Sequence, residues 1–254
     1  MHKMPFKRTI TATLILLASL LLTAVPAVAD TYIVAVGINR YKHITGLHVS
    51  EDDAKDFAEL CRKFPGAHVN IVTGRYATRE RLQKVIAKAY AGTSADDTLI
   101  FYFSGHGSPS GCAAYDTPAA SSGRGFLTFD YIASVMKKSP ARRKIIISDS
   151  CYSGASRSSK KKSRTHRRAD PNVILFMSSR ANETSLEAIG GTNSIFTRYL
   201  LKGMGGAADA NGDRLITARE LFNYVSSQVE HASQGKQHPV MWGNFDENFI
   251  IFRR

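Results

Sequence analysis

Continuous apolar stretches alternate with amphipathic stretches along most of the chain. The apolar stretches have the length of buried strands. They predict strands at residues 32–37, 69–72, 98–103, 144–147, 173–177 and 248–252.

The intervening stretches carry apolar residues at helical spacing. From Phe57 to Phe64 these residues follow the i, i+3, i+4, i+7 pattern, which predicts a helix over 51–64. Further helices are predicted from Thr78, as the N-cap, to Tyr90, and over 128–138, 194–203 and 217–231. The alternation predicts an α/β fold, a three-layer α/β/α sandwich whose mostly parallel sheet of about six strands is covered on both faces.

Composition is that of a globular protein. The chain has 254 residues, of which 43% are hydrophobic and 22% charged, and it has three cysteines. These values exclude a disordered chain and a disulfide-stabilised scaffold.

The first 29 residues have the pattern of a secretory signal peptide. Three basic residues precede an apolar run from Ile10 to Val25, and Ala27-Val-Ala29 is an A-x-A cleavage site. We therefore expect cleavage after Ala29, export to the periplasm or the extracellular space, and a single domain over 30–254 with no stable membrane span. An uncleaved membrane anchor is the alternative, because the run is slightly long for a signal-peptide core.

The net charge of +13 is concentrated in two segments. Three positive charges lie in the predicted signal peptide and seven between Arg157 and Arg168, which leaves about +3 on the rest of the chain. A nucleic-acid partner is not expected, because segment 157–168 lacks the interleaved aromatic residues of a single-strand-binding groove.

Two breaks in the pattern follow the carboxyl ends of predicted strands, where open α/β sheets place their ligand sites. The Gly/Ser/Ala-rich stretch 107–125 and the basic stretch 153–171 form these breaks. His106 and Cys151 come at their starts, each beside small residues. We expect both side chains at one edge of the sheet.

A cysteine beside a histidine at such an edge is typical of a thiol nucleophile with an imidazole partner. The imidazolium lowers the pKa of the thiol and so supplies thiolate near neutral pH. The amides of Gly107 and Cys151 are the predicted oxyanion-hole donors. The alternatives are a structural histidine with a core cysteine, and a metal site, for which no second ligand pair is present.

The motifs Ser-Gly-His-Gly at 104–107 and Asp-Ser-Cys-Tyr-Ser-Gly at 149–154 resemble the paired catalytic motifs of the caspase-like cysteine peptidases, in particular of the bacterial metacaspase-like branch. His106 and Cys151 are 45 positions apart, near the roughly 50 expected for a caspase-type pair. The similarity extends to segments 35–41, 178–187 and 196–203, and so covers nearly the whole mature chain.

This resemblance implies a caspase-hemoglobinase fold and a catalytic dyad acting on protein or peptide substrates. His106 would be the general base or imidazolium partner, and Cys151 the nucleophile that forms a thioester with the substrate. The chemistry requires no cofactor and no third orienting carboxylate.

The resemblance also identifies a substrate pocket. Asp149 stands two residues before the nucleophile, where caspases that cleave after aspartate carry glutamine, and Asp53 matches the acid of the family's L-x-G-C-x-x-D-A pattern. Ser50 departs from the cysteine of that pattern, and with Ser104 it is assigned to the same pocket. Two carboxylates predict cleavage after Arg or Lys, since charge-assisted hydrogen bonds favour a cation. The alternative for Asp53 is a solvated charge among neighbouring acids.

Segment 157–168 lies where caspases are cut between their large and small portions. Its seven Arg and Lys residues, in a Ser-rich stretch that we expect to be disordered, offer bonds to an Arg/Lys-directed peptidase. We therefore predict a zymogen that processes itself there. The alternatives are a solvated surface segment and a contact with an anionic surface.

Four oxygen-bearing side chains take positions 1, 3, 5 and 12 of an EF-hand-like loop: Asp209, Asn211, Asp213 and Glu220. They predict a calcium site, although position 6, normally glycine, is Arg214. The alternative is a turn followed by a helix that begins with a Thr217/Glu220 capping box.

Cys61 is expected in the core, because it lies on the apolar face of its predicted helix, and Cys112 in an exposed loop. The sequence does not decide whether they pair. Two functions compete with the peptidase: a non-catalytic caspase-like binding or scaffold module, and a binder of anionic polymers that uses segment 157–168.

Overall fold

The computed structural model describes residues 29–108, 110–119, 125–151, 173–180, 183, 191–243 and 249–253. Residues 1–28 of the predicted signal peptide and the basic segment 157–168 lie outside the described residues. Within the described ranges, no helix has the length and apolar character needed to cross a membrane.

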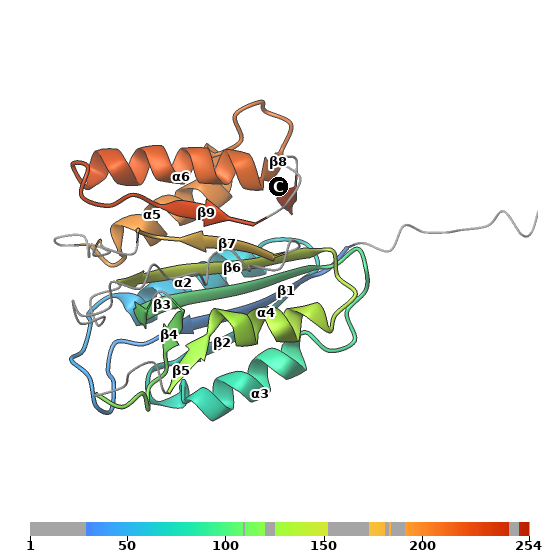
Figure 1. Ribbon diagram of the computed structural model, residues 1–254. Helices are drawn as coiled ribbons and strands as arrows, with labels where there is room; N and C mark the ends of the chain where they lie inside the picture. Colours follow the sequence, from blue (N-terminus) through green and yellow to red (C-terminus); the bar gives the residue numbers. More distant parts are fainter. Residues whose placement is uncertain are drawn as a thin grey trace, which may run out of the picture.

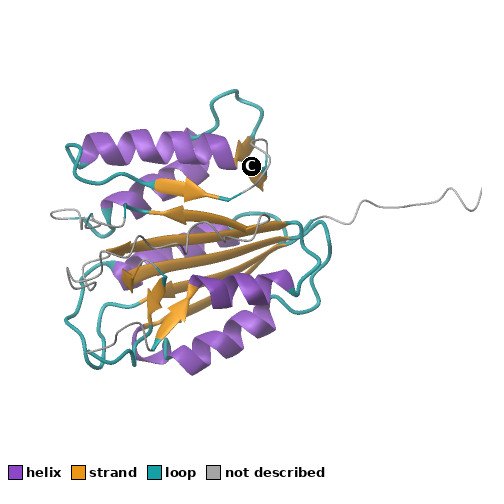
Figure 2. Ribbon diagram, in the orientation of Figure 1, coloured by secondary structure: helices purple, strands orange, loops and turns teal. Residues whose placement is uncertain are grey.

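A mostly parallel sheet forms the middle layer of the fold (Figures 1 and 2). Six strands follow the order β2-β1-β3-β6-β7-β9, and neighbouring strands are parallel except for β7 and β9. Their bounds are β1 Thr31–Gly37, β2 Ala67–Thr73, β3 Thr98–Ser108, β6 Arg143–Cys151, β7 Val173–Met177 and β9 Val240–Trp242.

Helices cover both faces of this sheet. One face packs against α2, α5 and α6, and the other against α3 and α4 (Figure 1). Their bounds are α2 Ser50–Arg62, α3 Arg79–Ala89, α4 Phe129–Lys137, α5 Ile195–Lys202 and α6 Ala218–Ala232. Two shorter helices are the 3₁₀ helix η1 Gly74–Tyr76 and the π-helix η3 Gly203–Ala207. Successive residues of a strand belong to opposite cores, as Ile33 and Val34 do, so the strands are apolar throughout. The predicted three-layer sandwich is confirmed.

Short strands account for the differences from the prediction. β4 (Gly111–Ala113) lies within the stretch 107–125, expected to be a loop, and β5 (Phe126–Thr128) follows this stretch directly. β4 pairs antiparallel with β3 and β5. The predicted strand at 248–252 is β10 (Ile250–Arg253), which pairs with β8 (Leu215–Thr217) outside the main sheet. The sixth strand of the main sheet is β9, whose three residues are too few to show a periodic pattern.

The two cysteines outside the predicted dyad are free and fully buried. Cys61 lies in the core beneath α2, as predicted, whereas Cys112 lies in β4 within the core of the opposite face. The expected exposure of Cys112 is therefore wrong, because the stretch taken for a loop folds into a strand. Since the two thiols lie on opposite faces of the sheet, they do not pair, and burial raises the pKa of each.

Candidate active site

The main sheet brings His106 and Cys151 side by side. His106 lies near the carboxyl end of β3, β6 ends at Cys151, and the two residues are register partners in adjacent parallel strands. Adjacent strands are about 4.8 Å apart. The structure thus places the two residues of the predicted dyad at one edge of the sheet.

The His106 ring is held by the loop that follows β1. Its Nε2 lies 2.9 Å from the carbonyl oxygen of Thr45, so Nε2 carries a hydrogen and donates it. The backbone N–H of His106 donates to the Tyr41 hydroxyl at 2.7 Å, and the two rings pack with their centroids 5.1 Å apart. Because Nε2 is bound to Thr45, Nδ1 is the nitrogen suited to proton transfer.

Two glycines of the histidine motif make room for close contacts. A Cβ at Gly105 would lie 2.4 Å from the Tyr41 hydroxyl, and one at Gly107 would lie 2.5 Å from Ser150 Oγ. Glycine therefore allows Tyr41 to reach the backbone of His106, and Ser150 to pack against β3. The residues of the predicted oxyanion hole, Gly107 and Cys151, lie at the neighbouring ends of β3 and β6.

A third glycine positions α2 over the sheet edge. A Cβ at Gly37, the last residue of β1, would lie 2.2 Å from the Ser50 carbonyl oxygen and 2.7 Å from Ala54 Cβ. The first turn of α2 can therefore lie directly on the end of β1. This contact places the buried residues Ser50 and Asp53 at the same edge as His106.

Asp53 and Asp149 are both buried beside this edge, with exposed fractions of 0% and 3%. Asp149 lies on β6 and is the register partner of Ser104 on β3. The Ser104 hydroxyl donates to Asp53 Oδ2 at 2.8 Å. The alternative that Asp53 is a solvated surface charge is therefore wrong, because its turn of α2 faces the sheet.

Two hydroxyl residues of α5 connect the carboxylates. The Ser194 N–H donates to Asp53 Oδ1 at 3.0 Å, and the Ser194 hydroxyl donates to Asp149 Oδ2. Thr197 Oγ1 donates to the same Asp149 oxygen at 2.8 Å and accepts from the Tyr102 hydroxyl at 2.6 Å. Ser194 is also the N-cap of α5, so the acid pair lies at the positive end of a helix.

The burial of two neighbouring carboxyl groups disfavours the ionised form of Asp53. Burial and the neighbouring charge of Asp149 raise the pKa of Asp53 to about 8, against the opposing hydrogen bonds from Ser104 and Ser194. The buried environment therefore favours the protonated form of Asp53 more than water does. A guanidinium or ammonium group beside both carboxyl groups would favour the ionised form.

Three of the predicted calcium ligands, Asp209, Asn211 and Asp213, lie in the connection between α5 and α6, and Glu220 lies in the first turn of α6. Asp209 accepts from the amides of Gly212 and Arg214 at 2.9 and 3.1 Å, and Arg214 adopts a φ of +65°. Glu220 and Thr217 form the alternative capping box, which is confirmed. Among the described residues, no three His, Cys, Asp or Glu side chains group as a metal site. Calcium binding by Asp209, Asn211, Asp213 and Glu220 stays a prediction.

The family model described as the caspase domain matches residues 31–250. No curated protein sequence matches the chain at a significant level.

Many solved structures share the fold, among them the following three. Caspase-1 from Spodoptera frugiperda is 14% identical with a TM-score of 0.66, and the match covers 89% of this chain and 91% of that one. The structure of pro-sf-caspase-1 is 12% identical with a TM-score of 0.64, and the match covers 88% of this chain and 94% of that one. A protein from Geobacter sulfurreducens is 19% identical with a TM-score of 0.60, covering 89% of this chain and 97% of that one.

Proposed function

Because the chain belongs to the caspase-domain family, we propose that it is a cysteine endopeptidase that cleaves after arginine or lysine. The observation that carries this proposal is the pairing of His106 with Cys151 at adjacent strand ends, beside the buried carboxyl groups of Asp53 and Asp149. The pair supplies a nucleophile with its base, and the acids supply a site for a cation.

The proposed reaction begins with transfer of the Cys151 proton to Nδ1 of His106, whose Nε2–H is held by the Thr45 carbonyl. The thiolate adds to the scissile carbonyl, and the amides of Gly107 and Cys151 stabilise the oxyanion. His106 then protonates the departing amine, which leaves a thioester on Cys151. Water, deprotonated by His106, hydrolyses the thioester and restores the thiol.

The proposed selectivity follows from the charge of the acid pair. A substrate cation displaces the proton held by Asp53 and interacts with both Asp53 and Asp149. An aspartate side chain would instead add a further negative charge beside Asp149 in a buried site. Ser50 and Ser104 belong to the same proposed pocket, and the Ser104 hydroxyl fixes the orientation of Asp53.

Fluorogenic peptides that end in Arg, Lys or Asp test this function. We expect the wild-type protein, with or without added calcium, to hydrolyse the Arg and Lys peptides and to leave the Asp peptide intact. Cys151→Ala should hydrolyse none of them. A wild-type protein without any Cys151-dependent cleavage would favour the non-catalytic module.

Self-processing in segment 157–168 follows from the same selectivity. We expect intact-mass spectrometry of the purified wild-type protein to show cleavage after one or more of its seven Arg and Lys residues, while Cys151→Ala stays whole. An equally intact segment in both proteins would contradict self-processing. Cleavage in both would assign the cut to another protease.

Export directed by residues 1–29 and calcium binding by the 209–220 loop are further proposals, and they rest on the sequence. The peptidase itself requires neither, since its chemistry needs only the dyad and the pocket. The calcium arm of the peptide assay separates a cation-dependent enzyme from a cation-independent one.

A further inference from the structure

β6 extends beyond β7 at its carboxyl end. The parallel pairing of these strands stops at Ser148 and Met177, whereas β6 continues to Cys151. On its other side, β6 stays paired with β3 through Cys151. The last residues of β6 therefore need partners other than a strand on the β7 side.

Ser178, directly after β7, supplies these partners. Its backbone N–H donates to the Ser148 carbonyl at 2.9 Å, and its hydroxyl accepts from the Ser150 N–H at 3.2 Å. Ser178 is fully buried. A side-chain oxygen thus takes the place of a strand carbonyl at the residue that precedes Cys151.

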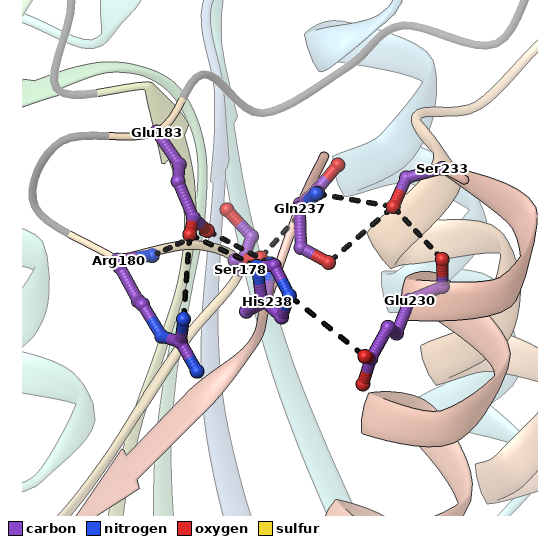
Figure 3. Close-up of polar contacts among 7 residues, drawn as sticks. All are labelled: Ser178, Arg180, Glu183, Glu230, Ser233, Gln237 and His238. Atoms are coloured by element: carbon purple, nitrogen blue, oxygen red, sulfur yellow. Dashed lines mark hydrogen bonds and ion pairs between the residues drawn. The ribbon is translucent and has the colours of Figure 1, made fainter. Parts of the chain in front are cut away.

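Gln237 fixes Ser178 from the segment between α6 and β9 (Figure 3). Its Nε2 donates to the Ser178 carbonyl at 2.9 Å, and its backbone N–H donates to Ser233 Oγ at 3.0 Å. Gln237 is fully buried. A buried amide is costly unless it is hydrogen-bonded, so these contacts define its position.

A second attachment lies beside Gln237. His238 Nδ1 lies 2.9 Å from Glu183 Oε1, and the His238 N–H donates to Glu183 Oε2 at 2.9 Å (Figure 3). Arg180 also donates its N–H to Glu183, at 3.3 Å. The segment around Gln237 is therefore joined to the residues after β7 at two points.

We propose that Ser178 and Gln237 are positioning residues for the nucleophile. Gln237 holds Ser178, and Ser178 holds the end of β6 at which Cys151 lies. This inference rests on the proposed function, because it takes Cys151 as the nucleophile. It makes the α6–β9 segment part of the active-site support, although neither residue touches the reacting atoms.

Two variants of Ser178 test its contact with the carboxyl end of β6. Ser178→Ala removes the acceptor of the Ser150 N–H, and Ser178→Thr keeps a hydroxyl. Ser179→Ala is the control, because Ser179 is equally buried and its Oγ has no hydrogen-bond partner among the described residues. We expect Ser178→Ala to lower kcat about 10-fold with little change in KM. Ser178→Thr should recover most of the lost kcat, and Ser179→Ala should have the kcat of the wild type.

Gln237→Met tests the residue that holds Ser178 in place. Gln234→Met, which changes an exposed residue nearby, is its control. We expect only Gln237→Met to reduce kcat and the rate at which iodoacetamide alkylates Cys151. Both kcat and the alkylation rate are divided by the titrated concentration of folded enzyme, so a loss of stability alone does not change them. If Gln237→Met does not fold, the Ser178 series decides the question.

Equal kcat values and equal alkylation rates in Ser178→Ala and Ser179→Ala would overturn the proposal, as would an effect of Ser178→Ala on KM alone. Alkylation keeps this test separate from the proposed function. If the wild-type protein is alkylated at Cys151 but cleaves no peptide, the proposed peptidase function is refuted. A slower alkylation of Ser178→Ala than of the wild type would in that case still support the positioning role of Ser178.

Discussion

We expect His106→Ala to lower kcat for an arginine-ended peptide by about 1000-fold or more, with a far smaller change in KM. The variant removes the group that accepts the thiol proton and later protonates the leaving amine. The acid pair that binds the substrate cation stays in place, because its hydrogen bonds come from α5 and β3. Steady-state kinetics measure the effect, with the exposed His231→Ala as the control.

The same variant should change the pH dependence of Cys151 alkylation. In the wild type the imidazolium keeps the thiol reactive below its ordinary pKa of about 8.5, and in His106→Ala the midpoint moves up towards that value. Cys61 and Cys112 do not obscure the signal, because burial raises the pKa of both thiols. Identical pH profiles in the two proteins would contradict the dyad.

The second large effect concerns the substrate cation. We expect Asp149→Asn to reduce kcat/KM for an arginine-ended peptide by about 100-fold, because it removes one of the two buried counter-charges of the guanidinium. The measured quantity is the ratio of kcat/KM between arginine and citrulline peptides, since citrulline is a neutral analogue of nearly the same shape. Asp52→Asn, which changes an exposed acid on α2, is the control. An unchanged ratio in Asp149→Asn would exclude this carboxylate from the pocket.

The ratio should also depend on pH through Asp53. Its pKa is raised to about 8 by burial and by Asp149, so at lower pH a substrate cation must displace a proton. The arginine-to-citrulline ratio of the wild type should therefore increase as the pH rises towards 8 and level off above it. Changes in the protonation of His106 and Cys151 affect the cleavage of both peptides equally, so they cancel in this ratio. In Asp53→Asn the ratio should be low at every pH, and a rise like that of the wild type would assign the titration to another group.

The meeting of His106 with Cys151 was predictable from the sequence, because parallel strands end at a common edge and both residues follow apolar strands. The pocket was predictable in part. Asp53 precedes Phe57 by one helical turn, so the helical pattern already placed it on the apolar face. The neighbouring acids on α2 concealed this signal.

Contacts between distant segments were not predictable. Ser194 lies 141 positions from Asp53, and no local pattern connects an N-cap serine with a carboxylate on another helix. The Thr45 carbonyl that holds His106 is a backbone group, which any residue could provide. The short strand β9 escaped prediction for a different reason, since three residues give no periodicity.

Covalent capture tests the central claim most directly, because it reports the nucleophile and the pocket together. The wild-type protein is treated with peptidyl chloromethyl ketones that end in arginine or aspartate, and peptide mapping locates the thioether formed as chloride leaves. We predict one equivalent of the arginine reagent on Cys151, much faster than the aspartate reagent, with Cys151→Ala unlabelled and His106→Ala labelled slowly. Labelling of another residue, or faster labelling by the aspartate reagent, would contradict a cysteine peptidase directed to arginine and lysine.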